Sequence, residues 1–214
     1  MTTDSLLIGE KVCIVYSDAD LLIACKPTGL LSVPGRLPEN QDNLTGRLQT
    51  LYPDALNVHR LDQVTSGLMV YARNKMAQAV LSRQFAQRQI GKRYIALVQG
   101  LVAQDAGEVR LPLICDWPRR PRQIVHYELG KAAHTRWRVL ERDQEQQHSR
   151  LELEPVTGRS HQLRVHMAEI GHPIVGDDFY GAAPAARVML HAAELRLQHP
   201  STGQWMQWQN TPNF

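Results

Sequence analysis

A dense group of polar side chains precedes a short apolar run in the segment His59 to Gly67. The segment places an arginine, Arg60, two residues before a carboxylate, Asp62. A carboxylate on a loop that an adjoining strand holds still can serve as a nucleophile, and a nearby guanidinium keeps it ionised at neutral pH. The alternative is an aspartate that closes an Asx-turn with Thr65 or Ser66. The segment by itself leaves both interpretations open.

A second arginine, Arg164, lies in the segment Gly158 to His166. If Ser160 caps a helix here, Arg164 lies one turn inside that helix. An arginine that the helix buries needs a carboxylate partner, because an unpaired charge in a protein core costs several kcal/mol. Asp62 is the candidate partner. A purely structural ion pair and an exposed, solvated arginine are the alternatives.

A third segment, Lys92 to Gly100, has the alternation of a strand. In a strand, Tyr94, Ala96 and Val98 point to one face of the sheet. An aromatic ring at such a position could stack on a base that has been flipped out of a nucleic-acid helix. The alternative, which is the commoner case, is that Tyr94 packs in the hydrophobic core.

Basic residues are concentrated in two parts of a chain whose net charge at pH 7 is only +3. Between Arg119 and Arg138, six lysines and arginines stand against a single acid, Glu128. Between Arg83 and Arg93 there are four basic residues and no acid. Local basic stretches on a nearly neutral protein suit a surface that binds a polyanion. A solvated surface without a partner is the alternative for either stretch.

The composition limits the class of protein. The 214 residues are 43% hydrophobic, which predicts a globular fold with a core large enough for one domain. No apolar run approaches the roughly 20 residues that a bilayer requires. The three cysteines lie far apart and form no CxxC pair, which is typical of a protein of an intracellular, reducing compartment.

The elements that would position the polar segments are mostly short strands joined by turns. The apolar pattern predicts strands over Val12–Tyr16, Leu21–Ala24, Leu68–Ala72, Tyr94–Val98, Thr135–Leu140, Arg150–Glu154, Leu195–Gln198 and Trp205–Trp208. One helix is predicted from a cap at Asn74 to about Gln89, and another from Ser160 to Gly171. Because strands outnumber helices, we expect an α+β fold, with a mainly antiparallel mixed β-sheet core flanked by helices and loops.

The polar segments also match a known set of motifs, in the same order along the chain. They read KPTG from Lys26, HRLDQVTSG from His59, KRYIALVQG from Lys92 and GRSHQLRVH from Gly158, with a weaker match at Met189 to Ala192. In these motifs the chain resembles the RluA family of pseudouridine synthases. Four motifs in family order, from about Lys26 to His166, are far more specific than any one of them.

The resemblance implies an isomerase that breaks the C1′–N1 bond of a uridine, rotates the base and rejoins it through C5, without a cofactor or a metal. It makes Asp62 the essential carboxylate, which either attacks C1′ or removes a proton from C2′. Arg164 would pair with Asp62 and orient it. Tyr94 would pack on the uracil, and Arg60 would help to occupy the space that the flipped uridine leaves.

The resemblance also bears on partners and domains. Leu31 to Arg36 and Leu111 to Pro118 are similar to family members that act on both large-subunit (23S-type) ribosomal RNA and a tRNA anticodon stem-loop. The first motif begins at Lys26, which leaves no room for the N-terminal S4 domain of many relatives. We therefore expect a single catalytic domain over residues 1–214, a monomer in the cytoplasm. From charge alone, we expect the stretch Arg119 to Arg122 to clamp phosphates through Arg119, Arg120 and Arg122.

Three other classes of protein compete with this interpretation. A metal hydrolase could use the nine histidines, but the chain has no HExxH motif, and His161 and His166 are five residues apart, off a common helical face. A non-catalytic RNA-binding module would bind RNA in a salt-dependent way without forming product. A glycosidase or nucleosidase usually has two carboxylates flanking the bond, and the motifs hold one.

Overall fold

The structure is a computed structural model that describes residues 6–8, 12–35 and 37–214; Arg36 of the similarity noted above lies outside the described residues. The chain forms two compact units. The first is Met1–Lys92 with Ala192–Pro212, and the second is Arg93–His191 with Asn213–Phe214. The expectation of a single catalytic domain without an S4 domain stays a prediction.

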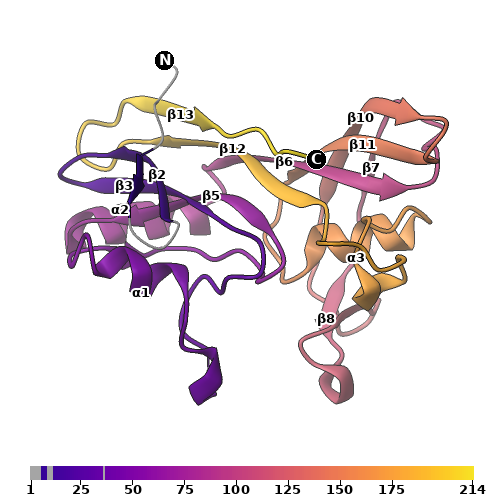
Figure 1. Ribbon diagram of the computed structural model, residues 1–214, viewed down its shortest axis with the longest axis horizontal. Coiled ribbons are helices and arrows are strands. Elements are labelled where there is room, and N and C mark those ends of the chain that lie inside the picture. The colour runs from indigo at the N-terminus through magenta and orange to yellow at the C-terminus, as the bar shows by residue number, and fades with distance from the viewer. Residues whose placement is uncertain (1–5, 9–11, 36) are drawn as a thin grey trace. The chain divides into compact units, whose positions relative to one another are not determined.

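Strands of the first unit pair antiparallel in the order β1-β2-β3-β5 (Figure 1). Two further antiparallel pairs join β4 to β5 and β13 to β12. The strands are β1 (Leu6–Ile8), β2 (Val12–Ser17), β3 (Leu21–Lys26), β4 (Leu56–Asn57), β5 (Ser66–Ala72), β12 (Leu190–Gln198), whose first two residues belong to the second unit, and β13 (Trp205–Gln209). The predicted strands of this part of the chain are confirmed, with ends that differ by a few residues.

Two helices belong to the first unit, α1 (Leu44–Gln49) and α2 (Lys75–Ala86), together with the short 3₁₀ turn η1 (Pro38–Asn40). Asn74 caps α2 as predicted, because its side chain accepts a hydrogen bond of 2.8 Å from the backbone N–H of Ala77. The helix ends before the predicted Gln89. Arg88 takes a φ of 58°, in the left-handed region that interrupts a right-handed helix.

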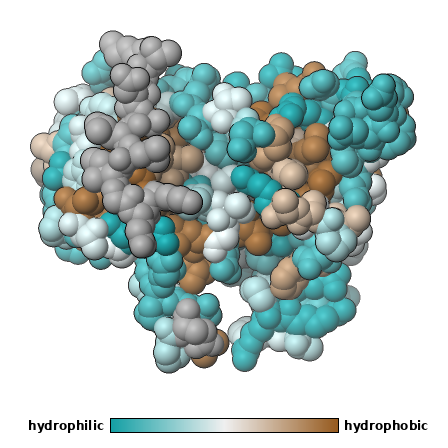
Figure 2. All heavy atoms as spheres, in the orientation of Figure 1, coloured by the Kyte–Doolittle hydropathy of each residue, from teal (hydrophilic) through white to brown (hydrophobic). Residues whose placement is uncertain are grey.

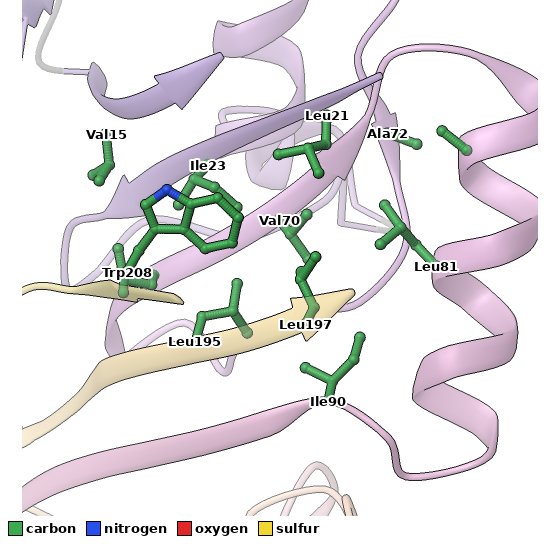
Figure 3. Packing of buried hydrophobic residues seen from close by; sticks show 12 residues of the cluster. Val15, Leu21, Ile23, Val70, Ala72, Leu81, Ile90, Leu195, Leu197 and Trp208 are labelled. Atoms are coloured by element: carbon green, nitrogen blue, oxygen red, sulfur yellow. The ribbon is translucent and has the colours of Figure 1, made fainter. Parts of the chain in front are cut away.

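The core of the first unit lies where β3, β5 and the end of β12 meet α2. Figure 3 shows Trp208 of β13 packed beside leucines and isoleucines of the neighbouring strands. The buried members of this cluster are Val15, Leu21, Ile23, Leu68, Val70, Ala72, Ala77, Leu81, Ile90, Leu195, Leu197 and Trp208. All seven residues of β5 are buried, so this strand gives the polar loop that precedes it a rigid base.

The second unit has its own antiparallel ladder, in the order β6-β11-β10-β7. A separate hairpin pairs β8 with β9. The strands are β6 (Gly91–Gln99), whose first residues belong to the first unit, β7 (Ala106–Val109), β8 (Leu113–Cys115), β9 (Gln123–Val125), β10 (Thr135–Asp143) and β11 (His148–Pro155). The predicted hairpin of residues 135–154 is confirmed, with a bulge between Val139 and Glu141.

Helix α3 (Gln162–Glu169) and the 3₁₀ turns η2 (Trp117–Arg119) and η3 (Asp178–Tyr180) complete the second unit. The prediction that Ser160 caps α3 is wrong. The helix begins after His161, which has a φ of 51° and makes no side-chain cap. The side chain of Gln162, the first residue of the helix, instead fixes the preceding loop, because its oxygen accepts hydrogen bonds from the Arg159 N–H and the Thr157 hydroxyl.

Helix α3 ends as predicted, since Gly171 adopts a φ of 84° immediately after the C-cap residue Ile170. The three α-helices and the antiparallel strand pairs of the described residues confirm the α+β prediction. Within residues 6–8, 12–35 and 37–214, no helix is both long enough and apolar enough to cross a membrane.

Candidate active site

The lysine of the first motif, Lys26, holds the loop that carries Asp62 by hydrogen bonds. Lys26 is fully buried at the end of β3. Its Nζ donates hydrogen bonds to the carbonyl oxygens of Pro27 (2.9 Å), Leu30 (2.7 Å) and Gln63 (2.9 Å). Three backbone carbonyl oxygens thus accept hydrogen bonds from the buried ammonium, which lowers the cost of its burial. The bond to Gln63 ties the residue after Asp62 to the end of β3.

A second clamp fixes the residue before Asp62. The hydroxyl of buried Ser32 accepts a hydrogen bond from the N–H of Leu61 (3.0 Å) and donates one to the carbonyl of the same residue (2.7 Å). Thr28 donates to the carbonyl of Val64 at 2.7 Å. Asp62 is therefore flanked on both sides by backbone that the segment after β3 holds in place.

Asp62 itself is partly buried, and its neighbour Arg60 is exposed. The N–H of Thr65 donates to the backbone carbonyl of Asp62 at 3.1 Å, which closes a tight turn just before β5. Gly67 follows with a φ of 115°, and a Cβ there would collide with the carbonyl oxygen of Ala192. Only glycine permits this close approach, so residue 67 fixes the path of the backbone from the turn into β5.

His59 has a structural place at the start of the loop. Its ring stacks on Phe85 of α2, with 4.5 Å between the ring centroids. Its Nε2 accepts a hydrogen bond of 3.0 Å from the N–H of Val70. Burial, with a smaller contribution from the positive charge of Lys92, lowers the pKa of His59 to about 3. The ring is therefore neutral at physiological pH and serves as an acceptor.

Arg164 is buried in α3 and has a carboxylate partner, Asp177, which is fully buried. The pair is bidentate, with Nε 2.6 Å from Oδ2 and Nη2 2.7 Å from Oδ1. The predicted need for a partner is thus met within the second unit. Pairing of Arg164 with Asp62, which belongs to the first unit, stays a prediction.

Two aromatic rings lie close to the guanidinium of this ion pair. The Arg164 guanidinium lies 5.0 Å from the ring centroid of Tyr180 and 5.7 Å from that of Phe179. The Tyr180 hydroxyl is 2.7 Å from His161 Nδ1 and accepts a hydrogen bond from the N–H of Gln123 in β9. Tyr180 therefore connects α3 to the β8–β9 hairpin.

The segment Asp177 to Tyr180 was not among the predicted site residues. It supplies the carboxylate and both rings that hold Arg164. The only signal in the sequence was a pair of acids and a pair of aromatics, Asp-Asp-Phe-Tyr, between two glycines. Such a segment is also a common surface turn, so composition alone did not identify it.

Tyr94 lies in β6 opposite Leu153 of β11 and is partly buried. Ala96 and Val98, which share its face, are fully buried, and this confirms the predicted alternation. Tyr94 and Arg164 belong to the second unit and Asp62 to the first. Their joint catalytic role stays a prediction.

The three predicted phosphate-binding arginines all lie in the turn between β8 and β9. Their surroundings differ: Arg119 contacts Asp116, Arg120 lies over Trp117, and Arg122 lies over Tyr180. Among the described residues, no group of three or more His, Cys, Asp or Glu side chains is arranged to hold a metal ion.

Comparison with known sequences gives a consistent set of matches. Residues 20–169 match the family model described as RNA pseudouridylate synthase. A relative from Yersinia pestis named "Dual-specificity RNA pseudouridine synthase RluA" is 50% identical over 205 residues, which cover 94% of this chain and 99% of that protein. A relative of the same name from Escherichia coli K12 is 48% identical over 205 residues, covering 94% of this chain and 93% of that protein.

Solved structures agree. The structure of "Human RNA Pseudouridylate Synthase Domain Containing 1" matches with a TM-score of 0.81 at 30% identity, covering 96% of this chain and 85% of the other. "Human RNA Pseudouridylate Synthase Domain Containing 4" matches with a TM-score of 0.75 at 25% identity, covering 94% of this chain and 88% of the other.

Proposed function

Because the chain belongs to the RNA pseudouridylate synthase family, we propose that it converts specific uridines to pseudouridine in two kinds of RNA, large-subunit ribosomal RNA and a tRNA anticodon stem-loop. The chain is a pseudouridine synthase, an isomerase that acts on RNA. The observation that carries the dual specificity is the 50% identity to the Yersinia pestis relative, over 94% of this chain and 99% of that protein.

Asp62 is the catalytic carboxylate of the proposed reaction. The C1′–N1 bond of the uridine breaks and a C1′–C5 bond forms, while C5 loses a proton and N1 gains one. Asp62 starts the reaction either by attack on C1′ or by removal of a proton from C2′. The clamps from Lys26 and Ser32 support this role, because a carboxylate that must approach one atom of the ribose gains from a loop with little freedom.

Arg164 and Tyr94 complete the proposed catalytic set. In this proposal, Arg164 is the cationic partner that pairs with Asp62 and orients it. Its bidentate contact with Asp177 supports the role, since it fixes the plane of the guanidinium while leaving other N–H groups of the fork unused by that carboxylate. Tyr94 packs on the uracil, and exposed Arg60 occupies the space that the flipped uridine leaves.

The isomerisation rearranges bonds within one uridine, with no redox change and no group transfer, so the proposal includes no cofactor. It also places the enzyme in the cytoplasm as a monomer, where RNA is its only required partner. The arginines Arg119, Arg120 and Arg122 contribute the phosphate contacts, in keeping with their position in one basic turn.

Release of tritium from RNA labelled at C5 of uridine tests the proposal, since the C5 hydrogen is lost when the C1′–C5 bond forms. Wild-type protein should release tritium from an anticodon stem-loop and from ribosomal RNA, and Asp62→Asn should release none from either. RNA affinity should change only a few fold, because the substitution keeps the shape of the side chain. Turnover by Asp62→Asn near the wild-type rate would refute the assignment of Asp62.

Two other outcomes address competing functions. RNA binding by the wild type without release from either RNA or from total cellular RNA would indicate a binding module. Free uracil among the products would indicate a nucleosidase, because the base would have left the ribose without rejoining it.

A further inference from the structure

The turn between β8 and β9, Asp116–Arg122, has a well-defined backbone. The N–H of Asp116 donates to the carbonyl of Arg122 at 2.9 Å, which closes the turn. Inside it, the N–H of Arg119 donates to the Asp116 carbonyl at 2.9 Å, and the N–H of Arg122 donates to the Arg119 carbonyl at 3.0 Å. We call this segment the arginine turn. These backbone hydrogen bonds fix the positions of the Cα atoms from which its side chains extend.

The three arginines of the arginine turn are not equivalent. Arg119 Nε lies 2.8 Å from the carboxylate of Asp116, which is only 6% exposed, so part of its charge is balanced. Arg122 is partly buried, with its guanidinium 5.9 Å from the ring centroid of Tyr180. Arg120 is exposed, and its guanidinium lies 5.6 Å from the ring centroid of Trp117. Arg120 and Trp117 therefore form a stack at the surface.

Trp117 is unusually accessible for an indole. Its exposed fraction is 67%, whereas Trp137 and Trp208 are buried. An exposed tryptophan forgoes the burial that normally stabilises a large aromatic side chain. Figure 1 shows the turn after β8 extending away from α3, and Figure 2 colours that part of the face mostly as hydrophilic. The neighbours of the indole along the turn include the charged residues Asp116, Arg119 and Arg120.

We propose that Trp117 and Arg120 form a stacking platform that binds an unpaired nucleotide of the RNA substrate, outside the group of residues assigned to the reaction. The base stacks on the indole, and the guanidinium of Arg120 binds an adjacent phosphate. The proposal rests on the proposed function, since it concerns how the same enzyme holds its RNA.

Charge favours RNA over a protein partner. Within the arginine turn, three arginines and one aspartate give a net charge of +2 (3 − 1), and the aspartate is buried. A protein partner would cover the indole with apolar side chains and would leave the cations without counter-charges. An RNA strand supplies an aromatic face for the ring and phosphates for the arginines, which is the usual composition of a single-strand binding surface.

Unpaired nucleotides are also the part of RNA that such a platform selects. A base in a helix already stacks on its neighbours, so it offers no free face to a tryptophan. A base in a loop has such a face, and stacking on an aromatic side chain strengthens binding by roughly 5-fold to roughly 100-fold per base. The platform therefore favours stem-loops over uninterrupted duplexes.

The experiment measures the dissociation constant of a stem-loop RNA in the Asp62→Asn background, where no product forms. Trp117→Ala should weaken binding by about 10-fold, and Trp117→Phe should restore most of it because an aromatic face remains. Affinity for a fully paired duplex should change far less. Equal affinity of Trp117→Ala and its parent for the stem-loop would overturn the proposal, as would an equal loss for the duplex.

Trp205 provides a matched control. It is 49% exposed in the β12–β13 hairpin of the first unit, and the guanidinium of Arg196 lies 4.7 Å from its ring centroid. It lacks the neighbouring arginines of the arginine turn. Trp205→Ala should bind the stem-loop as its parent does. An equal loss in both tryptophan variants would show a general effect of exposed aromatics and would overturn the specific assignment.

The role of Arg120 is tested by salt dependence. Arg120→Ala should reduce the slope of log affinity against log salt by about one unit, whereas Trp117→Ala should leave the slope unchanged. An unchanged slope in Arg120→Ala would overturn the phosphate contact. Tritium release by protein with Asp62 intact is measured separately, so that loss of the proposed function is distinguished from loss of the platform.

Discussion

Arg164 and Asp177 form a buried, bidentate ion pair that joins α3 to the turn η3, thirteen residues further along the chain. Arg164 is 3% exposed and Asp177 is fully buried. Two charges so far from water depend on one another, because either alone would remain in the core without a counter-charge. The turn that carries Asp177 therefore determines how the guanidinium of Arg164 is presented.

Asp177→Asn is expected to lower both stability and activity. Loss of one partner of a buried pair typically costs about 3–5 kcal/mol of unfolding free energy. Chemical denaturation measures this loss, and tritium release at a temperature where the variant is folded measures activity. Asp178→Asn is the matched control, since its side chain is exposed in the same turn. If Asp177→Asn unfolded at the same denaturant concentration as Asp178→Asn, the ion pair of Arg164 and Asp177 would contribute nothing to stability.

Arg164→Ala should show the same direction in both measurements, because it leaves the carboxylate of Asp177 buried without its partner. The double variant should lose less than the sum of the two single losses, since one interaction is removed in both. Additive losses would mean that the two residues act independently, against the contact described here.

Ser32→Ala removes both hydrogen bonds that hold the backbone of Leu61 next to Asp62. The N–H and carbonyl of Leu61 would then lack these partners in a buried place, at a cost of about 1–3 kcal/mol. We expect kcat to fall while RNA affinity stays near that of the wild type, because the loop keeps its charges but loses its fixed geometry. Steady-state tritium release separates kcat from KM.

Ser201→Ala is the control for this variant, since Ser201 lies in the β12–β13 turn and its hydroxyl donates to Asp20 in the turn between β2 and β3. It should change neither parameter. A fall in affinity without a fall in kcat for Ser32→Ala would argue against a positioning role.

His59 predicts a pH dependence of stability. Its pKa falls from 6.5 to about 3 on folding, so between these values the unfolded chain carries a proton that the folded chain does not. The free energy of unfolding should therefore fall as the pH is lowered through this window, by up to about 1.4 kcal/mol per pH unit from this residue. The contribution is fully present above pH 6.5.

Denaturation between pH 6.5 and pH 5, above the range where most carboxylates titrate, measures this slope. His59→Gln should flatten it, whatever the change in absolute stability from the lost stack on Phe85. The same slope in the wild type and in His59→Gln would mean that the ring is protonated in the folded protein.

The phosphate contacts proposed for the arginine turn predict a salt effect. Replacing its three arginines, Arg119, Arg120 and Arg122, by alanine should weaken RNA binding and reduce the salt slope by about one unit per lost contact. A control that removes three paired arginines outside both basic stretches, Arg47, Arg142 and Arg150, separates local contacts from net charge. Equal slopes in the two triple variants would place the RNA on another surface.

Local patterns in the sequence determined much of this protein. The alternation of apolar residues gave the strands, Asn74 gave the start of α2 and Gly171 the end of α3, because each depends on neighbours a few residues away. The four motifs identified the family, which the comparisons confirm. They also indicated Asp62 as the candidate carboxylate, on a loop before a buried strand.

Only the tertiary structure decided which groups support those residues. The amine of Lys26 reaches the carbonyl of Gln63, and the hydroxyl of Ser32 holds Leu61, across 37 and 29 positions of sequence. No sequence pattern pairs Asp177 with Arg164, and the helix cap that the pattern predicts at Ser160 does not form. Such contacts form when folding brings distant segments together. Local sequence patterns do not indicate which buried donor will meet which acceptor.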